Sequence, residues 1–263
     1  MGLLCCALGG LPLAAQDKPA SIFKILKLEG HQVRWALPAG NTPRVVTYRL
    51  VTEERRFPNA RNCHGLVPLD NLAMASRLSL PAIQEELRSA FGMWEAAANI
   101  VFHEAADGAA ADIQIGAQSE PEGWAYTDVF YDTASREAVT PINKALICLN
   151  PAKRWKIGFN GDLKTYDLRY TLAHEIGHAI GLDHPPGSNQ IMHFRYEERF
   201  RSLQPGDIRG AVAIYGAPPQ QPGLLVAGGA ERGPAATPGQ SSDTPASPAP
   251  SQASPVGGRA LGK

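Results

Sequence analysis

Three histidines in the segment 174–184 have the spacing of a metal site. His174 and His178 are four residues apart, so on one helix their imidazoles project from the same face. Gly181 follows, a residue that can adopt a left-handed conformation, end the helix and return the chain with His184. Three neutral imidazoles leave one tetrahedral position open to water, as in a catalytic zinc site. The spacing therefore predicts one catalytic Zn²⁺.

A carboxylate stands beside the first of these histidines. Glu175 is adjacent to the ligands without being one, which suits a general base that takes a proton from zinc-activated water. The predicted reaction is hydrolysis without a covalent intermediate. The alternative is a set of unrelated histidines with ordinary hydrogen bonds, which would require this spacing to arise by chance. The remaining histidines lack such spacing and are expected at the surface or in packing: His31, His64, His103 and His193.

The histidines need a helix that buries its opposite side. Leu172, Ile176 and Ile180 form a stripe rotated away from the ligands, which predicts a helix near Asp167 to Gly181. Apolar residues between Leu80 and Trp94 recur at helical spacing, after a potential cap at Ser79 and with Pro81 in the first turn. A third helix is expected near Pro205 to Tyr215. Three tryptophans are expected in packing roles: Trp35, Trp94 and Trp155.

Strand patterns occupy the rest of the first two thirds of the chain. Val45 to Val51 is rich in β-branched and aromatic residues, which is typical of a strand. Shorter strands are expected at Asn99 to Phe102, Asp112 to Gly116 and Ala145 to Leu149. This order of elements predicts an α+β domain with a mixed sheet.

Charge and composition restrict the partners and the compartment. The 25 Lys and Arg residues balance 25 Asp and Glu residues, and no basic cluster occurs, so nucleic acid is not expected as a partner. Residues 1–15 are apolar and uncharged and end in small residues, which predicts a signal peptide; a floppy start or a misplaced initiator Met is the alternative. The stretch is too short for stable membrane insertion. We expect a secreted protein or one of the cell envelope or periplasm.

The C-terminal segment has a different composition. Residues 217–263 consist mainly of Pro, Gly, Ser, Ala and Gln, which bury too little apolar surface to offset the entropy of ordering. We expect a disordered tail there and a folded domain at 16–216.

The cysteines predict one disulfide bond. Cys5 and Cys6 lie in the predicted leader, which leaves Cys63 and Cys148 to pair in an exported domain. Alternatively, Cys63 is a free thiolate that occupies the zinc as an internal inhibitor.

The zinc motif and the residues after it resemble the metzincin metallopeptidases. The pattern HExxHxxGxxH at 174–184 is followed by Met192, which suits the Met-turn of these enzymes. Further stretches are similar to the matrixin branch over nearly the whole domain: 46–50, 90–94, 111–115 and 206–216. The resemblance implies a twisted, mixed five-stranded sheet with three helices and a monomeric zinc endopeptidase that acts on proteins or peptides, as in extracellular matrix turnover.

Departures from animal matrixins are also visible. No histidine occurs between His103 and His174, so a second, structural zinc is not expected. A Pro-Arg-Cys-Gly-type inhibitory segment and a hemopexin-like module are not found either. These features are more similar to a bacterial matrixin-type catalytic domain.

The resemblance also implies where substrate binds. An extended peptide is expected along a sheet edge near Gly123 to Tyr126, with Ala125 as a contact. Residues 194–200 would line the specificity pocket, and Tyr196 is expected either near the oxyanion or in simple packing. Bound Ca²⁺ is a further expectation, without named ligands. Two alternatives to an enzyme remain: a zinc-bound but non-catalytic binding module, and an adhesion protein that works through its tail and surface.

Overall fold

A mixed β-sheet with helices packed against it forms the part of the chain that the structure describes. This computed structural model describes residues 22–106, 109–187 and 189–219. The predicted leader at 1–15 and residues 220–263 of the tail predicted at 217–263 lie outside the described residues, so both stay predictions. None of the helices in the described ranges is both long and apolar enough to cross a membrane.

Five strands form the centre of the sheet. They are β7 (Ile100–Glu104), β4 (Arg44–Leu50), β8 (Ile113–Gln118), β10 (Val139–Leu149) and β9 (Ala125–Tyr131), in that spatial order. The first four are parallel, whereas β9 runs antiparallel to β10. Within the described residues β9 pairs only with β10, so its other edge is free.

Short strands enlarge this sheet beyond the five that the resemblance implied. β2 (Lys27–Leu28), β3 (His31–Arg34), β5 (Arg55–Arg56) and β6 (Gly65–Val67) bring the sheet to nine strands. Two separate pairs are β1 (Lys24–Ile25) with β13 (Leu182–Asp183), and β11 (Trp155–Lys156) with β12 (Tyr166–Asp167). Elements of two to four residues carry too little alternation to be read from sequence.

The structure contains four helices within the described residues, not three. α2 (Leu80–Ala97), α3 (Leu168–Ala179) and α4 (Pro205–Tyr215) were predicted, and the Ser79 side chain accepts a hydrogen bond from the Ala82 N–H at 3.3 Å, as a cap does. The additional helix is α1 (Asp70–Ser76), which has no side-chain cap and ends at Arg77 in a left-handed conformation. Two turns without a cap give little sequence signal.

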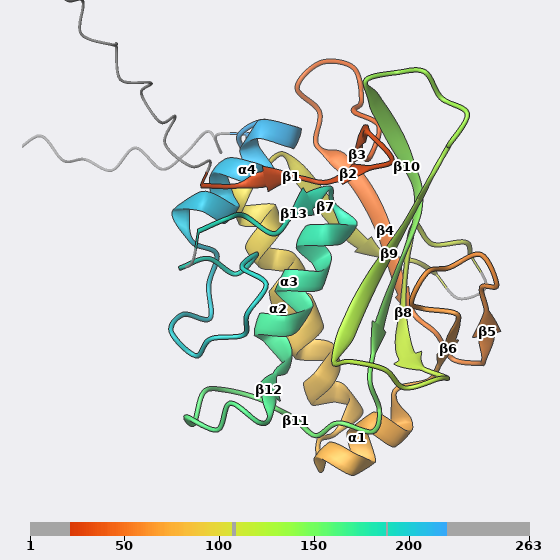
Figure 1. Cartoon of the computed structure of the whole chain (residues 1–263), viewed down its shortest axis with the longest axis vertical. Helices are drawn as coiled ribbons and strands as arrows, with labels where there is room; N and C mark the ends of the chain where they lie inside the picture. The colour runs from red at the N-terminus through yellow and green to blue at the C-terminus, as the bar shows by residue number, and fades with distance from the viewer. Residues whose placement is uncertain (1–21, 107–108, 188, 220–263) are drawn as a thin grey trace, which may run out of the picture. The chain divides into compact units, whose positions relative to one another are not determined.

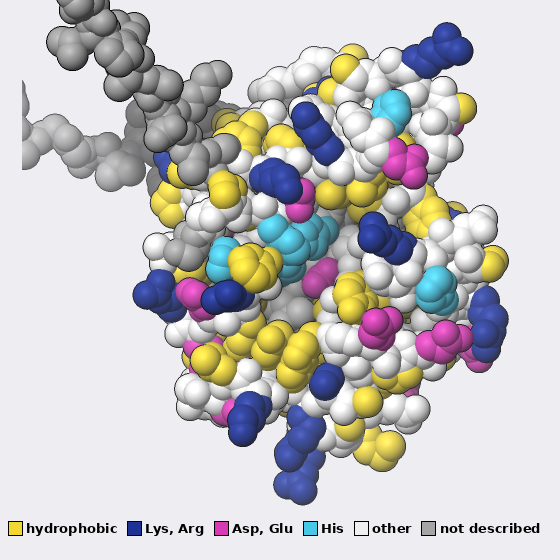
Figure 2. Space-filling model, in the orientation of Figure 1, with side chains coloured by type: hydrophobic (Ala, Val, Ile, Leu, Met, Phe, Trp, Pro, Cys, Tyr) yellow, Lys and Arg dark blue, Asp and Glu magenta, His cyan; other side chains and the backbone are white. Residues whose placement is uncertain are grey.

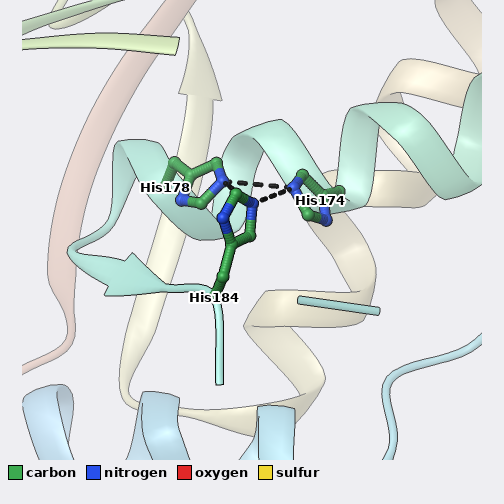
Figure 3. A group of neighbouring side chains, drawn as sticks. All are labelled: His174, His178 and His184. Atoms are coloured by element: carbon green, nitrogen blue, oxygen red, sulfur yellow. Dashed lines mark hydrogen bonds between the residues drawn. The ribbon is translucent and has the colours of Figure 1, made fainter. Parts of the chain in front are cut away.

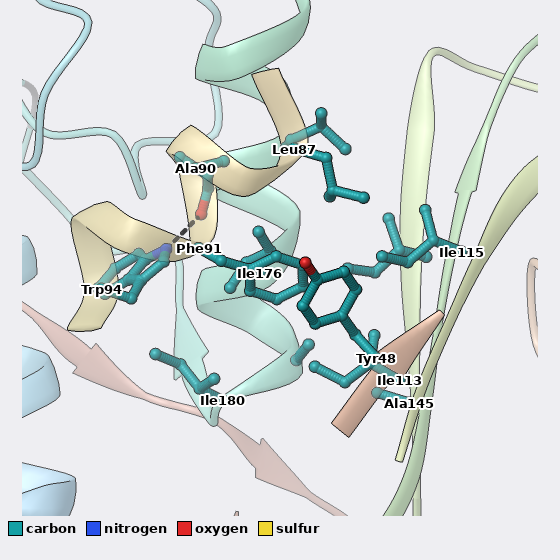
Figure 4. Close-up of a cluster of buried hydrophobic side chains, with 14 of the residues drawn as sticks. Tyr48, Leu87, Ala90, Phe91, Trp94, Ile113, Ile115, Ala145, Ile176 and Ile180 are labelled. Carbon is teal, nitrogen blue, oxygen red and sulfur yellow. Dashed lines mark hydrogen bonds between the residues drawn. The ribbon is translucent and has the colours of Figure 1, made fainter. Parts of the chain in front are cut away.

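Two hydrophobic clusters lie on opposite faces of the sheet. Alternate residues of β10 point to opposite sides: Ala145, Ile147 and Leu149 join the main core, whereas Leu146 and Cys148 join a smaller cluster. The main core lies between the sheet and helices α2 and α3, which run side by side (Figures 1 and 4). The three tryptophans predicted to pack are confirmed there, with exposures of 1%, 0% and 2%: Trp35, Trp94 and Trp155.

Candidate metal centre

Helix α3 starts from a fully buried aspartate. Asp167 is its N-cap, and its Oδ1 accepts a hydrogen bond from the Tyr170 N–H at 2.9 Å. Arg201 pairs with the same carboxylate at 2.8 Å, which compensates the buried charge. The stripe that the sequence predicted to face inward is buried throughout: Leu172, Ile176 and Ile180. The histidine face of α3 therefore points away from the main core.

The chain reverses direction at Gly181. This residue has φ +98°, a left-handed conformation that favours glycine, and a Cβ there would lie 2.4 Å from the Val33 carbonyl oxygen. The reversal leads into β13, which pairs with β1, and the Lys24 Nζ lies 2.6 Å from Asp183. This short pair of strands fixes the position of His184, the next residue.

The three predicted ligands converge on one point (Figure 3). The Nε2 atom of His174 lies 3.0 Å from that of His184 and 3.1 Å from that of His178, and the last pair is also 3.1 Å apart. Tetrahedral zinc with bonds of about 2.0–2.1 Å separates its nitrogens by roughly 3.3 Å, so the spacing is close to that of a zinc site. No other group of three such side chains occurs in the described ranges.

The partners of the Nδ1 atoms show that two of the Nε2 atoms direct a lone pair toward the centre of the triad. His174 Nδ1 lies 2.7 Å from the Ile191 carbonyl oxygen, and His178 Nδ1 lies 2.8 Å from that of Leu182. A carbonyl only accepts, so each Nδ1 carries the hydrogen and each Nε2 is unprotonated in the neutral ring. The Nε2 lone pairs of His174 and His178 therefore face each other at 3.1 Å with no hydrogen between them. A cation satisfies this arrangement, so the residues fit zinc.

Burial keeps these rings neutral. It lowers the pKa of His174, and it lowers the pKa of His178 well below the usual value, assisted by the neighbouring histidines. Burial, with a smaller contribution from repulsion by His174, lowers the pKa of His184 to about 4. Neutral imidazole is the form that binds a metal, so the triad is ready to bind one at neutral pH.

Glu175 lies beside the triad with one partner for its carboxylate. Its side chain is 6% exposed, and the Thr127 hydroxyl lies 2.7 Å from Oε2 and 3.0 Å from the Glu175 carbonyl oxygen. Burial raises the pKa of Glu175 to about 7, against the opposing effect of the Thr127 hydrogen bond. A cation held by the triad would lower this pKa again, because nearby positive charge favours the carboxylate.

The predicted Met-turn residue packs under the ligand helix. Met192 is 2% exposed, and a Cβ added to Gly177 would come within 2.2 Å of its sulfur. The backbone N–H groups of Ile191 and Met192 donate to Asp207 of α4 at 2.9 and 3.1 Å. Asp207 therefore holds the segment that supplies the carbonyl partner of His174. Sequence reasoning missed this role, although Asp207 stands in the first turn of a predicted helix.

A cleft of about 590 Å³ opens in front of the triad (Figure 2). Ala125 and Tyr196, the two predicted substrate contacts, both line it. Tyr166 also lines the cleft, which was not predicted. Its ring is stacked between those of Trp124 and Tyr196, with centroid separations of 3.8 Å and 4.1 Å. The Tyr196 hydroxyl already has partners, because it accepts from the Asp167 N–H and donates to a carboxylate, each at 2.9 Å. Tyr196 therefore holds the cleft wall.

The two cysteines are joined in the smaller hydrophobic cluster, on the face of the sheet away from the triad. Cys63 and Cys148 form a disulfide bond, so the Cys63 sulfur is not free to bind at the triad. The Asp128 carboxylate accepts the backbone N–H groups of Asn62 and Cys63, each at 2.8 Å. These bonds hold the loop that carries Arg61, which also lines the cleft.

Several known metalloproteinases are similar to this chain in sequence. The matrixin family model matches residues 71–216. Metalloendoproteinase 4-MMP of Arabidopsis thaliana is 26% identical over 222 residues, which cover 80% of this chain and 63% of that protein. Matrix metalloproteinase-19 of Mus musculus is 29% identical over 143 residues, 54% of this chain and 26% of that protein. Stromelysin-3 of Homo sapiens is 40% identical over 65 residues, 24% of this chain and 13% of that protein. The chain thus spans less than two thirds of the length of each of these relatives.

Proposed function

Because the chain belongs to the matrixin family, we propose that it is a zinc-dependent endopeptidase that hydrolyses peptide bonds in proteins or peptides. One observation carries the proposal: the Nε2 atoms of three histidines converge beside a buried carboxylate in an open cleft, and two of them are left unprotonated by Nδ1 hydrogen bonds to carbonyls. His174, His178 and His184 are the proposed zinc ligands, Glu175 the general base, and Met192 the supporting Met-turn residue.

The roles of the chain's own groups follow from their positions. When bound, zinc supplies Lewis-acid activation of water and of the scissile carbonyl. Glu175 accepts the proton of the attacking water and delivers it to the leaving amine, as a general base and then a general acid. The Nδ1 hydrogen bonds of His174 and His178 hold their rings in orientation throughout.

Substrate would pair with the edge of β9 that no other described strand occupies. β9 lines the cleft and has an unpaired side, so an extended peptide would add to it as a further strand, with Ala125 at its start. Main-chain pairing confers little sequence preference, so selectivity would come from the wall that contains Tyr196. We further propose that the protein is exported, with the leader at 1–15 as its signal peptide, and acts as a monomer outside the cytoplasm.

The first test compares the purified protein with its Glu175→Gln variant. Both should contain about one zinc per chain, and the wild type should cleave casein or a quenched fluorescent peptide until a zinc chelator is added. The variant should lose at least about 100-fold in kcat, the lower range for a general base. A zinc-loaded wild type that cleaves neither substrate would overturn the proposal in favour of a binding module. Full activity in the variant would remove Glu175 from the mechanism.

A further inference from the structure

We propose that Thr127 is a positioning residue that holds the general base in its reactive orientation. The inference rests on the proposed peptidase function and concerns the same site. Thr127 lies on the edge strand β9, whereas Glu175 lies on α3, 48 positions later in the chain. Their contact therefore links the strand where substrate would pair to the carboxylate that would take the proton.

The sheet dictates the direction of the Thr127 side chain. In the register of the two strands, Thr127 stands opposite Ile147, which belongs to the main core on the helix side. The neighbours Tyr126 and Asp128 stand opposite residues of the smaller cluster, on the other face. Successive side chains of a strand alternate between faces, so Thr127 must point toward α3. The position is thus set by the sheet and not by a mobile loop.

The Thr127 hydroxyl distinguishes the two oxygens of Glu175. It has one hydrogen and two acceptors within reach, Oε2 at 2.7 Å and the Glu175 carbonyl oxygen at 3.0 Å. The hydrogen is directed to the nearer and charged oxygen, since hydrogen bonds to ionised acceptors are stronger. Oε1 makes no hydrogen bond to any other described residue, and Glu175 lines the cleft. Oε2 is therefore held and Oε1 is left to receive the proton.

The chemistry of threonine suits this role. Branching at Cβ restricts its side-chain torsion, so the hydroxyl is oriented before substrate arrives. A glutamate without this bond could rotate its carboxylate about flexible torsions. Reacting groups that are misplaced by about 1 Å lose on the order of 100-fold in rate. Removal of the hydroxyl should thus slow the chemical step without weakening substrate or zinc binding.

The experiment compares Thr127→Val, which keeps the shape but removes the hydroxyl, with Thr127→Ser, which keeps the hydroxyl. We expect kcat of the valine variant to fall by about 10- to 100-fold. Its KM should stay within about twofold of wild type, because main-chain pairing of β9 is intact, and it should still contain about one zinc. The serine variant should recover kcat to within about threefold of wild type.

A matched control removes a hydroxyl from the same sheet. Thr140 of β10 is fully buried, and its hydroxyl contacts His31 and not Glu175, so Thr140→Val should keep the wild-type kcat. Wild-type kcat in Thr127→Val, or a serine variant as slow as the valine variant, overturns the inference. Loss of zinc from Thr127→Val would also overturn it, since the role would then be structural. An inactive, zinc-loaded wild type would instead overturn the proposed function itself.

Discussion

Gly177 lies between the two helical ligands at the point where α3 crosses Met192. A Cβ at this position would come within 2.2 Å of the Met192 sulfur and 2.9 Å of the Trp94 ring. Both neighbours are buried, so neither can swing into solvent. The helix therefore approaches the Met-turn as closely as it does only because residue 177 has no side chain.

We predict that Gly177→Ala destabilises the protein and weakens metal binding. Overpacking a buried contact costs about 1–3 kcal/mol of unfolding free energy, and a shift of α3 would move His174 and His178 with it. Denaturant unfolding of the metal-free protein and competition with a zinc chelator would measure the two effects.

Gly92 provides the control for this substitution. It lies within α2, and a Cβ there meets nothing within 4 Å. Gly92→Ala should therefore be neutral or stabilise by up to about 1 kcal/mol, because alanine favours the helix. Equal effects of the two alanines on stability and zinc affinity would contradict the proposed Gly177–Met192 contact.

The residues predicted from sequence are those whose geometry is local. Histidines four apart on one helix, followed by a glycine reversal, set their own relative positions within a few turns of chain. Thr127 and Asp207 carry no such signal, because their contacts with Glu175 and Met192 depend on how β9 and α4 pack against distant segments. Partners brought together by tertiary packing cannot be found by spacing alone.

At the scale of elements, the ammonium group of Lys156 binds several oxygens of the loop between β11 and β12. Lys156 is 9% exposed, and its Nζ contacts the Asp162 carbonyl oxygen at 2.7 Å, the Asn160 side-chain oxygen and the Glu198 carboxylate. Glu198 in turn accepts the Gly161 N–H at 2.6 Å and the Tyr196 hydroxyl. The ammonium thus supplies the positive charge that these loop oxygens need and fixes the cleft wall through Tyr196. Bound calcium elsewhere stays a prediction.

We predict that Lys156→Met lowers stability by about 2 kcal/mol, between the values for exposed and fully buried ion pairs. The melting temperature should fall by roughly 4–8 °C. KM should rise, since the wall at Tyr196 loses its support, whereas zinc content should be unchanged. Thermal unfolding and steady-state kinetics would measure these changes.

The Lys156–Glu198 ion pair also predicts how stability depends on pH in the acid range. Burial alone would raise the pKa of Glu198, but Lys156 and the loop N–H of Gly161 outweigh it and hold that pKa below its ordinary value. A lowered folded pKa contributes stability that is present above the unfolded value of about 4.3 and is lost as the pH falls through the folded value. The stability difference between wild type and Lys156→Met should therefore shrink below about pH 4.

A surface pair serves as the control for Lys156. Arg88 lies 3.0 Å from Glu85 on α2, and both side chains are at least half exposed. Arg88→Met should change stability by less than about 1 kcal/mol at any pH. A Lys156→Met variant that behaves like this control would show that the loop does not depend on its amine.

Most of the long helices and strands were predictable because their burial is periodic, whereas β9 was expected only as a sheet edge near Gly123 to Tyr126. α2 and α4 were located from apolar spacing, caps and prolines, and β4 from its β-branched run. β10 starts at Val139, earlier than the predicted Ala145. The prediction began late because Pro141 interrupts the strand pattern in the sequence. The short strands and the Lys156 network depend on contacts that no local window contains.

At the scale of the whole molecule, the Cys63–Cys148 disulfide bond cross-links the smaller of the two hydrophobic clusters. The disulfide joins the loop before β6 to β10, across 85 positions, and both sulfurs lie in the cluster on the side of the sheet away from the triad. The ligands and their carbonyl partners belong to the other side. Stability and metal binding should therefore respond differently when the bond is removed.

We predict that the double variant Cys63→Ser/Cys148→Ser loses about 2–4 kcal/mol of stability, which corresponds to roughly 5–15 °C in melting temperature. It should still bind one zinc and cleave peptide at 20 °C with a kcat close to wild type, because none of the ligand contacts is altered. Circular dichroism, metal analysis and peptidase assays would test this separation.

Reduction of the wild type provides the control, since it removes the bond without any substitution. The reduced wild type should melt near the temperature of the double variant. If the oxidised and reduced proteins melt together, the bond contributes no stability. Free thiols at both positions without reduction would show that the bond is not formed in the isolated protein.

The hydrogen-bond acceptors of the ligand rings have a consequence for how this site can change over generations. His174 and His178 are each oriented by a peptide carbonyl, of Ile191 and of Leu182, and every amino acid brings that group. A point mutation at either position can alter packing but cannot delete the acceptor. Ring orientation thus follows from the path of the chain, so substitutions in the cleft wall can change its shape and leave both acceptors in place.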